Sequence, residues 1–210
     1  MLAVHNARMY FYEPCNGHGL RHDPFNAIVA PRPIGWISTC AEDGTPNLAP
    51  YSFFNAFNYT PPLVGFASLG EKDSLRNART TGEFVWNLVT QDLAQAMNQS
   101  SAPVPFGTSE FALAGLDIAP SRVVRPPRVA ASPVALECKV TQIIQLQTQS
   151  GAAINTWLTM GEVVAVHIDD SLIRDGVYQT ATARPVVRGG GPGDYFSIGP
   201  EQLFRMTRPT

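Results

Sequence analysis

The tripeptide Lys72-Asp73-Ser74 is the part of this 210-residue chain whose residue types most directly indicate chemistry. Asp73 is predicted as the N-cap of a helix over 74–81 that Gly82 ends. The start of a helix presents free backbone N–H groups and the positive end of its dipole, to which Lys72 and Ser74 add a cation and a hydroxyl. Two or three charge-assisted bonds of about 1.5 to 3 kcal/mol each would hold a phosphate. The pattern indicates an anion site, although the tripeptide alone also fits an ordinary solvated helix start.

Short strands must position this site, because 18 prolines and 17 glycines leave little room for long helices. Strands are predicted over 34–41, 46–51, 62–68 and 84–89. Asp43-Gly44 predicts a two-residue hairpin turn between the first two of these strands. Besides the helix over 74–81, only 92–100 has a helical pattern.

Two longer segments, Val134 to Leu146 and Leu158 to Ile168, alternate apolar and polar residues, which predicts strands with one buried face. The sequence Gln149-Ser150-Gly151 supplies a turn, so the two segments are predicted to form a long antiparallel hairpin. Many strands without regular strand–helix alternation favour a mainly β fold, a closed or nearly closed antiparallel barrel with a few short helices. The Pro-, Ala- and Ser-rich stretch 100–133 is predicted as loops with a short excursion over this barrel.

Composition excludes several classes of function. A net charge of -2 with 15% charged residues provides no cluster of positive charge for nucleic acid. The sequence contains no run of 18 apolar residues, so no membrane-spanning helix is predicted. The N-terminus lacks the pattern of a secretory signal, and three distant cysteines fit neither a disulfide framework nor a metal site. His18 and His22 are four residues apart, but nearby Gly and Pro residues disfavour the helix that a metal pair would need. We therefore expect a cytoplasmic protein without a metal site.

Several separated sequence blocks resemble the flavin reductase-like proteins of the FMN-binding split-barrel superfamily. They are PRPIGWIST, the Asp-Gly turn, NLAPYSFFN, a strand opened by Pro-Pro, KDSLRN and TGEFVWN, followed by GEVVAVHIDD and GGGPGDYFSIGPEQLFRMTRP. The resemblance implies a Greek-key split β-barrel that forms a homodimer, with FMN held non-covalently near the subunit interface. It starts at Met9, so we expect a single FMN-binding domain over 9–210 and a disordered extension over 1–8.

The resemblance also implies which residues bind the cofactor. Along the isoalloxazine ring and its edge it places Ser38, Thr39, Asn47, Ala49, Pro50, Tyr51, Ser52, Phe53 and Asn55. Trp36 is most simply a barrel or interface residue, and its position two residues before Ser38 makes a flavin contact the alternative. Around the ribityl phosphate it places Arg32, Ser52, Lys72 and Ser74, with Asp73 capping the helix that points at the phosphate. For Arg32, which lies between two prolines, a solvated loop position is the alternative. His167 is by default a core or interface imidazole, and the resemblance adds a contact with a nicotinamide as the alternative.

Flavin chemistry explains why no catalytic triad or carboxylate pair is found, since hydride transfer belongs to the cofactor and the protein supplies binding and hydrogen bonds. The resemblance implies an oxidoreductase in which FMN takes hydride from NADH or NADPH and passes electrons to flavin, iron or a partner oxygenase. One alternative is an FMN-binding, redox-sensing or flavin-storage protein without turnover. Another is a pyridoxamine-phosphate-oxidase-like enzyme, which the sequence blocks match less well.

Overall fold

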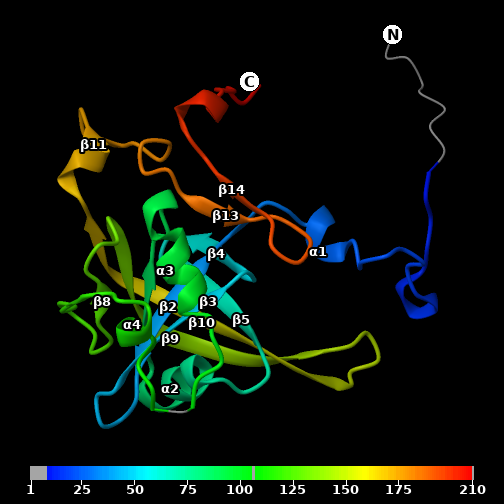
Figure 1. The fold of residues 1–210 in the computed structure, drawn as a ribbon, viewed down its shortest axis with the longest axis horizontal. Helices are drawn as coiled ribbons and strands as arrows, with labels where there is room; N and C mark the ends of the chain where they lie inside the picture. The colour runs from blue at the N-terminus through cyan, green and yellow to red at the C-terminus, as the bar shows by residue number, and fades with distance from the viewer. Residues whose placement is uncertain (1–8, 106, 210) are drawn as a thin grey trace.

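The computed structural model describes residues 9–105 and 107–209, and its main feature is one seven-stranded antiparallel sheet (Figure 1). The order of the strands across the sheet is β3-β2-β6-β9-β10-β5-β4. Their bounds are β2 Gly35–Cys40, β3 Pro46–Tyr51, β4 Phe54–Tyr59, β5 Pro62–Leu69, β6 Glu83–Asn87, β9 Val134–Gln147 and β10 Ala153–Ile168. The predicted mainly β fold with few short helices is confirmed. The predicted extension over residues 1–8 lies outside the described residues.

The β9–β10 hairpin is the longest element, and the sequence pattern predicted it correctly. Its turn is closed by a hydrogen bond from Thr148 N–H to the carbonyl of Ala152, at 2.8 Å. The hairpin runs through the centre of the sheet, since β9 pairs with β6 and β10 pairs with β5. Its tip projects away from the other strands (Figure 1).

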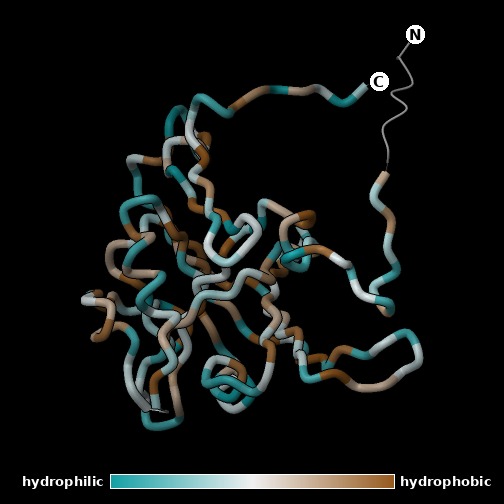
Figure 2. The backbone as a smooth tube through the Cα atoms, turned by 45° about the vertical axis from the view of Figure 1, so that its right-hand side comes forward, coloured by the Kyte–Doolittle hydropathy of each residue, from teal (hydrophilic) through white to brown (hydrophobic). Residues whose placement is uncertain are grey.

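Short elements surround this sheet. Helices and 3-10 turns are η1 Pro14–Asn16, α1 Phe25–Ile28, α2 Asp73–Thr81, η2 Gln91–Leu93, α3 Ala94–Gln99, α4 Glu110–Leu113, η3 Asp170–Leu172 and η4 Pro200–Gln202. The remaining strands are β1 Arg32–Pro33, β7 Ile118–Ala119, β8 Arg128–Val129, β11 Ile173–Arg174, β12 Val177–Tyr178, β13 Val186–Arg188 and β14 Tyr195–Ser197. In the described ranges, no helix combines the length and the apolar composition needed to cross a membrane. The chain after η4 extends away from the sheets (Figure 2).

The core consists mainly of aromatic and β-branched side chains from the two faces of the large sheet. Phe66 is fully buried, with its ring centroid 4.8 Å from Tyr51 and 5.4 Å from Phe84. Truncation of such a buried phenylalanine to alanine typically costs about 3 to 5 kcal/mol. This packing holds β3, which carries Tyr51, rigidly against β5 and β6.

Two local predictions were wrong, and one strand was missed. The turn between β2 and β3 contains three residues, 42–44, because Ala41 and Thr45 close it and Gly44 takes the left-handed conformation at φ +89°. The N-cap of α2 is Lys72, so Asp73 is the first helical residue, and its carboxylate accepts a hydrogen bond from Arg76 at 3.1 Å. Strand β4 has no predicted counterpart, because its residues are mostly exposed and lack an apolar alternation.

The stretch 100–133 is more structured than predicted. It contains α4 and the β7–β8 pair, and it contributes buried side chains of Phe111, Val124 and Val129 to the core. Short elements of two to four residues carry too little periodicity to be recognised from one sequence.

Candidate functional site

The predicted cofactor residues divide between two cavities and the protein interior. The first cavity, here the Lys72 cavity, has a volume of about 420 Å³ and lies between β3, the start of α2, and the segment that follows α3. Its lining residues are Asn47, Ala49, Pro50, Tyr51, Glu71, Lys72, Asp73, Ser74, Ser100, Ser101, Ala102, Pro103, Val104 and Glu110. Seven of the residues predicted to bind FMN therefore share one cavity: Asn47, Ala49, Pro50, Tyr51, Lys72, Asp73 and Ser74.

The N-terminus of α2 opens into the Lys72 cavity. The first backbone hydrogen bond of the helix runs from Arg76 N–H to the Lys72 carbonyl, at 2.9 Å. The N–H groups of residues 73–75 therefore lack intrahelical partners, as expected at a helix start. Lys72 is exposed, with Nζ 5.9 Å from the centroid of the Tyr51 ring, and it has no salt bridge to any described residue. Free donors and a free cation thus meet at one point.

Two acidic neighbours of Lys72 are engaged elsewhere. Glu71 forms a salt bridge with Arg79 at 2.7 Å, and Asp73 forms one with Arg76 at 3.1 Å. In both pairs the carboxylate is neutralised by a guanidinium group on α2. The cation of Lys72 is consequently left for a ligand.

Two polar atoms in the Lys72 cavity are buried without a hydrogen-bond partner among the described residues. They are Asn47 Oδ1 and the hydroxyl of Tyr51. A buried polar atom without a partner costs about 1 to 3 kcal/mol, so such atoms indicate a position where a ligand or water completes the structure. Burial raises the pKa of Tyr51 to about 12, opposed in part by the nearby hydroxyls of Ser74 and Ser68. Tyr51 is therefore a neutral hydrogen-bond donor at physiological pH.

Glu110 is a residue of this cavity that sequence reasoning missed. It is buried, and its Oε2 accepts a hydrogen bond from Leu48 N–H at 2.9 Å. Burial raises the pKa of Glu110, and the backbone N–H groups of Leu48 and Glu110 oppose that shift. Its position between Ser109, the N-cap of α4, and a buried phenylalanine is the only signal that the sequence offered.

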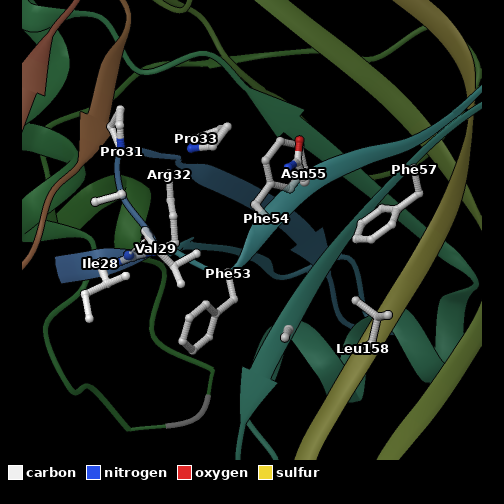
Figure 3. A pocket seen from close by; sticks show the side chains of 12 residues that line it. Ile28, Val29, Pro31, Arg32, Pro33, Phe53, Phe54, Asn55, Phe57 and Leu158 are labelled. Atoms are coloured by element: carbon white, nitrogen blue, oxygen red, sulfur yellow. Dashed lines mark hydrogen bonds between the residues drawn. The ribbon is translucent and has the colours of Figure 1, made fainter. Parts of the chain in front are cut away.

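The second cavity, here the Arg32 cavity, has a volume of about 440 Å³ and is mainly apolar (Figure 3). Its lining residues are Ile28, Val29, Ala30, Pro31, Arg32, Pro33, Phe53, Phe54, Asn55, Phe57, Ala67 and Leu158. In Figure 3, Ile28 and Val29 lie on the opposite side of Phe53 from Phe57 and Leu158. Three predicted cofactor residues, Arg32, Phe53 and Asn55, lie here and not in the Lys72 cavity.

The structure does not bring Arg32 to the predicted phosphate site. Its guanidinium donates to the carbonyls of Ser52 at 3.1 Å and Gly189 at 3.2 Å, and also to those of Asn26 and Val29. Arg32 is buried, and all three of its guanidinium nitrogens donate to backbone carbonyls, so most of its donors are engaged by the fold. Ser52 lines neither cavity and contributes its carbonyl to this arrangement.

Trp36, Ser38 and Thr39 point into the interior, and their side chains do not line either cavity. Trp36 Nε1 donates to Ser100 Oγ at 2.9 Å, directly beneath a wall of the Lys72 cavity. Ser38 Oγ donates to the carbonyl of Pro127, and Thr39 Oγ1 accepts from Asn77 at 3.1 Å. Trp36 therefore supports the cavity wall from behind, whereas Ser38 and Thr39 bond to residues that do not line this cavity.

His167 lies far from the Lys72 cavity along the sheet. His167 on β10 lies opposite Ala135 on β9, which lies opposite Asn87 on β6. Asn87 in turn lies opposite Trp36 on β2, and Trp36 opposite Pro50 on β3, at the wall of the Lys72 cavity. Four strand spacings amount to about 19 Å along the hydrogen-bonding direction. Within one chain, His167 is consequently not a wall of the cavity that contains Lys72. In the described ranges, no group of three or more His, Cys, Asp or Glu side chains could hold a metal ion.

Comparison with known proteins identifies the family. The model of the flavin reductase like domain matches residues 29–186. The chain belongs to this family. It is 39% identical over 188 residues to an uncharacterized protein of Halalkalibacterium halodurans, covering 87% of this chain and 88% of the relative.

Solved structures with similar folds support the architecture. Nitrilotriacetate monooxygenase component B from Bacillus cereus superposes with a TM-score of 0.85 at 27% identity, covering 95% of this chain and 100% of the other. The 2-nitrobenzoate 2-nitroreductase NbaA of Pseudomonas fluorescens superposes with a TM-score of 0.77 at 32% identity, covering 88% of each chain. The predicted split-barrel fold is confirmed.

Proposed function

We propose that this protein is an FMN-dependent oxidoreductase that takes hydride from NADH or NADPH and passes electrons to a second acceptor. The observation that carries the proposal is the Lys72 cavity. It combines a free helix N-terminus and a free ammonium with two buried polar atoms that lack partners among the described residues. Membership of the flavin reductase-like family supports flavin as the occupant.

The residues of the Lys72 cavity fit FMN by the chemistry of their donors. Lys72, the hydroxyl of Ser74 and the N–H groups at the start of α2 are suited to a phosphate, since each donates to an anion. Asn47 offers an unpaired acceptor and Tyr51 an unpaired donor, which suit ribityl hydroxyls or the heteroatom edge of a flavin. The small residues Ala49 and Ser101 leave room for a planar group.

Bound flavin would supply the hydride chemistry itself, and the chain supplies binding, orientation and exclusion of water. Tyr51 donates a hydrogen bond without losing its proton at physiological pH, since burial holds its pKa at about 12. Glu110 is the buried carboxyl of the cavity, and burial raises its pKa above the ordinary value. The wall formed by Ser100 and Pro103 limits access of water from the side of α3.

Two structural relatives suggest classes of electron acceptor. The Bacillus cereus protein is a component of a nitrilotriacetate monooxygenase, which favours a partner oxygenase as the acceptor. The Pseudomonas fluorescens protein is a nitroreductase for 2-nitrobenzoate, which favours a nitroaromatic compound. A homodimer with FMN near its interface remains part of the proposal, and the exposed aromatic side chains Phe57 and Tyr59 on β4 support an interface there. Cytoplasmic location stays a prediction.

The position of His167 favours a second candidate, a flavin-binding or redox-sensing protein without turnover. The residue predicted to contact a nicotinamide is separated from the Lys72 cavity by four strand spacings within one chain. Unless the second chain of a dimer brings its His167 to the flavin, the predicted contact between His167 and the nicotinamide is not formed.

Titration with FMN followed by anaerobic mixing distinguishes these functions. The purified protein should bind FMN and quench its fluorescence, and addition of NADH or NADPH without oxygen should bleach the yellow absorbance promptly. Bleaching by one donor only would also assign the nucleotide preference. Binding of FMN without bleaching by either donor would support the binding protein, and failure to bind FMN would overturn both functions.

A further inference from the structure

A third cavity, here the Arg122 cavity, lies where β8 meets the C-terminal end of β10, and the flavin proposal does not use it. Its volume is about 380 Å³, within the range of pockets that bind small molecules. Its lining residues are Arg122, Arg128, Ala130, Ser132, Pro133, Val166, His167, Ile168 and Asp169. It shares no lining residue with the Lys72 cavity.

Two guanidinium groups that form no salt bridge with any described residue line the Arg122 cavity. The segment 121–128 carries three arginines, of which Arg125 has a carboxylate partner, Glu83, at 3.6 Å. Arg122 and Arg128 line the cavity and have no carboxylate partner in the described ranges. Arg128 Nε donates to the carbonyl of Pro120 at 3.2 Å, which orients its guanidinium while leaving the terminal nitrogens available. Planar guanidinium groups held in this way suit oxyanions.

A buried carboxylate anchors both the arginine segment and His167. Glu137 is fully buried and accepts hydrogen bonds from the N–H groups of Arg122 at 2.8 Å, Val123 at 2.6 Å and Val124 at 3.0 Å. It also contacts His167 Nε2 at 2.5 Å. Burial alone would raise the pKa of Glu137, but these hydrogen bonds outweigh it and lower the pKa to about 2. Glu137 therefore acts as a charged tether behind the cavity, and His167 Nδ1 is the ring atom left for a ligand.

One carboxylate opposes the two cations. Asp169 lines the cavity, and its Oδ1 accepts from Ser171 N–H at 2.9 Å and from Ser171 Oγ at 2.6 Å. Its Oδ1 is thus already hydrogen-bonded outside the cavity, and the charged Glu137, which is bonded to backbone N–H groups and to His167, does not line the cavity. Among the charged side chains that line the cavity, two guanidinium groups face one carboxylate. The balance favours an anion over a cation as the ligand.

We propose that the Arg122 cavity is a second ligand site, which binds a small multivalent oxyanion bearing phosphate or carboxylate groups through Arg122, Arg128 and His167. The ligand bridges the two guanidinium groups and relieves the repulsion between like charges that face one cavity. Glu137 holds the arginine segment and His167 in position, and does not touch the anion. The inference does not depend on flavin binding, since the two cavities are separate.

Titration of the full-length protein with two probes, inorganic pyrophosphate and citrate, tests the site. The ring signals of His167 can be followed by NMR, because the chain has only four histidines and the variant His167→Gln assigns the signal. We expect a saturable shift of the His167 signal. Arg122→Gln and Arg128→Gln should each weaken binding about tenfold, the loss of one charge-assisted contact. Arg174→Gln, which removes an exposed arginine on β11, is the matched control and should bind like the wild type.

The response to the two probes identifies the ligand class. Tighter binding of pyrophosphate assigns the site to phosphate groups, and tighter binding of citrate assigns it to carboxylates. Absence of a saturable shift with either probe up to about 10 mM would overturn the proposal, since that limit excludes even weak specific binding. Unchanged affinity in the Arg122→Gln/Arg128→Gln double variant would also overturn it. FMN titration of the same samples separates this result from the proposed function, because either one can fail alone.

Discussion

Arg32 and Lys72 are two cations that sequence reasoning assigned to the same phosphate, and the structure gives them opposite environments. Arg32 is buried, and four backbone carbonyls from Asn26, Val29, Ser52 and Gly189 occupy its guanidinium. Lys72 is exposed beside the free N-terminus of α2 and has no carboxylate partner among the described residues. The charge of a side chain therefore does not define an anion site. What defines it is charge left unsatisfied by the fold.

The different environments imply different consequences of mutation. Arg32 ties together α1, the turn between β3 and β4, and the loop after β13, so its loss should affect folding. Lys72 has its ammonium over the Tyr51 ring and forms no salt bridge with a described residue, so its loss should affect ligand binding. Four predictions test this comparison.

The largest effect is expected for Arg32→Ala in flavin-free protein. The substitution leaves four carbonyls, in buried or partly buried hydrogen bonds, without their donor, which should lower the free energy of unfolding by about 4 kcal/mol. Urea denaturation followed by circular dichroism measures the change. Arg79→Ala, at an exposed position on α2, is the control and should change stability by no more than about 0.5 kcal/mol. Wild-type stability of Arg32→Ala combined with weakened FMN binding would return Arg32 to the flavin site.

Glu137 extends the comparison to a buried carboxylate whose oxygens accept hydrogen bonds within the fold. Its pKa lies near 2 in the folded protein, below the ordinary value of 4.5, so the group stabilises the fold above about pH 4.5. That contribution is lost as the pH falls toward 2, and its size is roughly 3 kcal/mol. Glu137→Gln should be destabilised at pH 7, with a difference from the wild type that shrinks as the pH is lowered.

Denaturation measured at several pH values between 7 and 2 checks this expectation. A constant difference between Glu137→Gln and the wild type across that range would show that the carboxylate charge contributes nothing. Glu71→Gln, which removes an exposed carboxylate, is the control, and its stability should follow the wild type at every pH.

Lys72→Ala should leave stability nearly unchanged and weaken FMN binding about ten- to a hundredfold, since it removes one charge-assisted contact with a phosphate. Fluorescence quenching of FMN gives the dissociation constant. Lys139→Ala removes an equally exposed lysine on β9 and should bind FMN like the wild type. Equal affinity of the two variants would exclude Lys72 from the phosphate site.

The smallest effect is expected for Tyr51→Phe, which removes a buried hydroxyl that has no partner among the described residues. Flavin-free protein should keep its stability or gain slightly, because an unsatisfied hydroxyl is costly to bury. FMN binding should weaken about threefold to tenfold if the ligand accepts a hydrogen bond from Tyr51. Unchanged affinity together with lower stability would mean that the hydroxyl serves the fold instead.

Sequence patterns predicted most of the elements that build the site, but only some of the contacts within it. The alternation in β9 and β10 and the apolar runs of β2, β5 and β6 reflect burial, which the residue types record directly. Strand β4 was missed because its pairing with β5, and not its own composition, makes it a strand. Glu110 was missed because it enters the Lys72 cavity from a helix of four residues.

The sequence by itself determined the mainly β class, the long hairpin, the helix that follows Lys72 to within one residue of its start, and the resemblance to the flavin reductase-like family. These features depend on local residue types and on blocks of residues that are near in sequence. Only the tertiary structure decided which charges remain free. Arg32 meets a carbonyl 157 residues away at Gly189, whereas Lys72 meets no acid among the described residues, and no local pattern records such distant contacts. The same reason explains why the Arg122 cavity, assembled by Glu137 from the segment 121–128 and from β10, was not predicted.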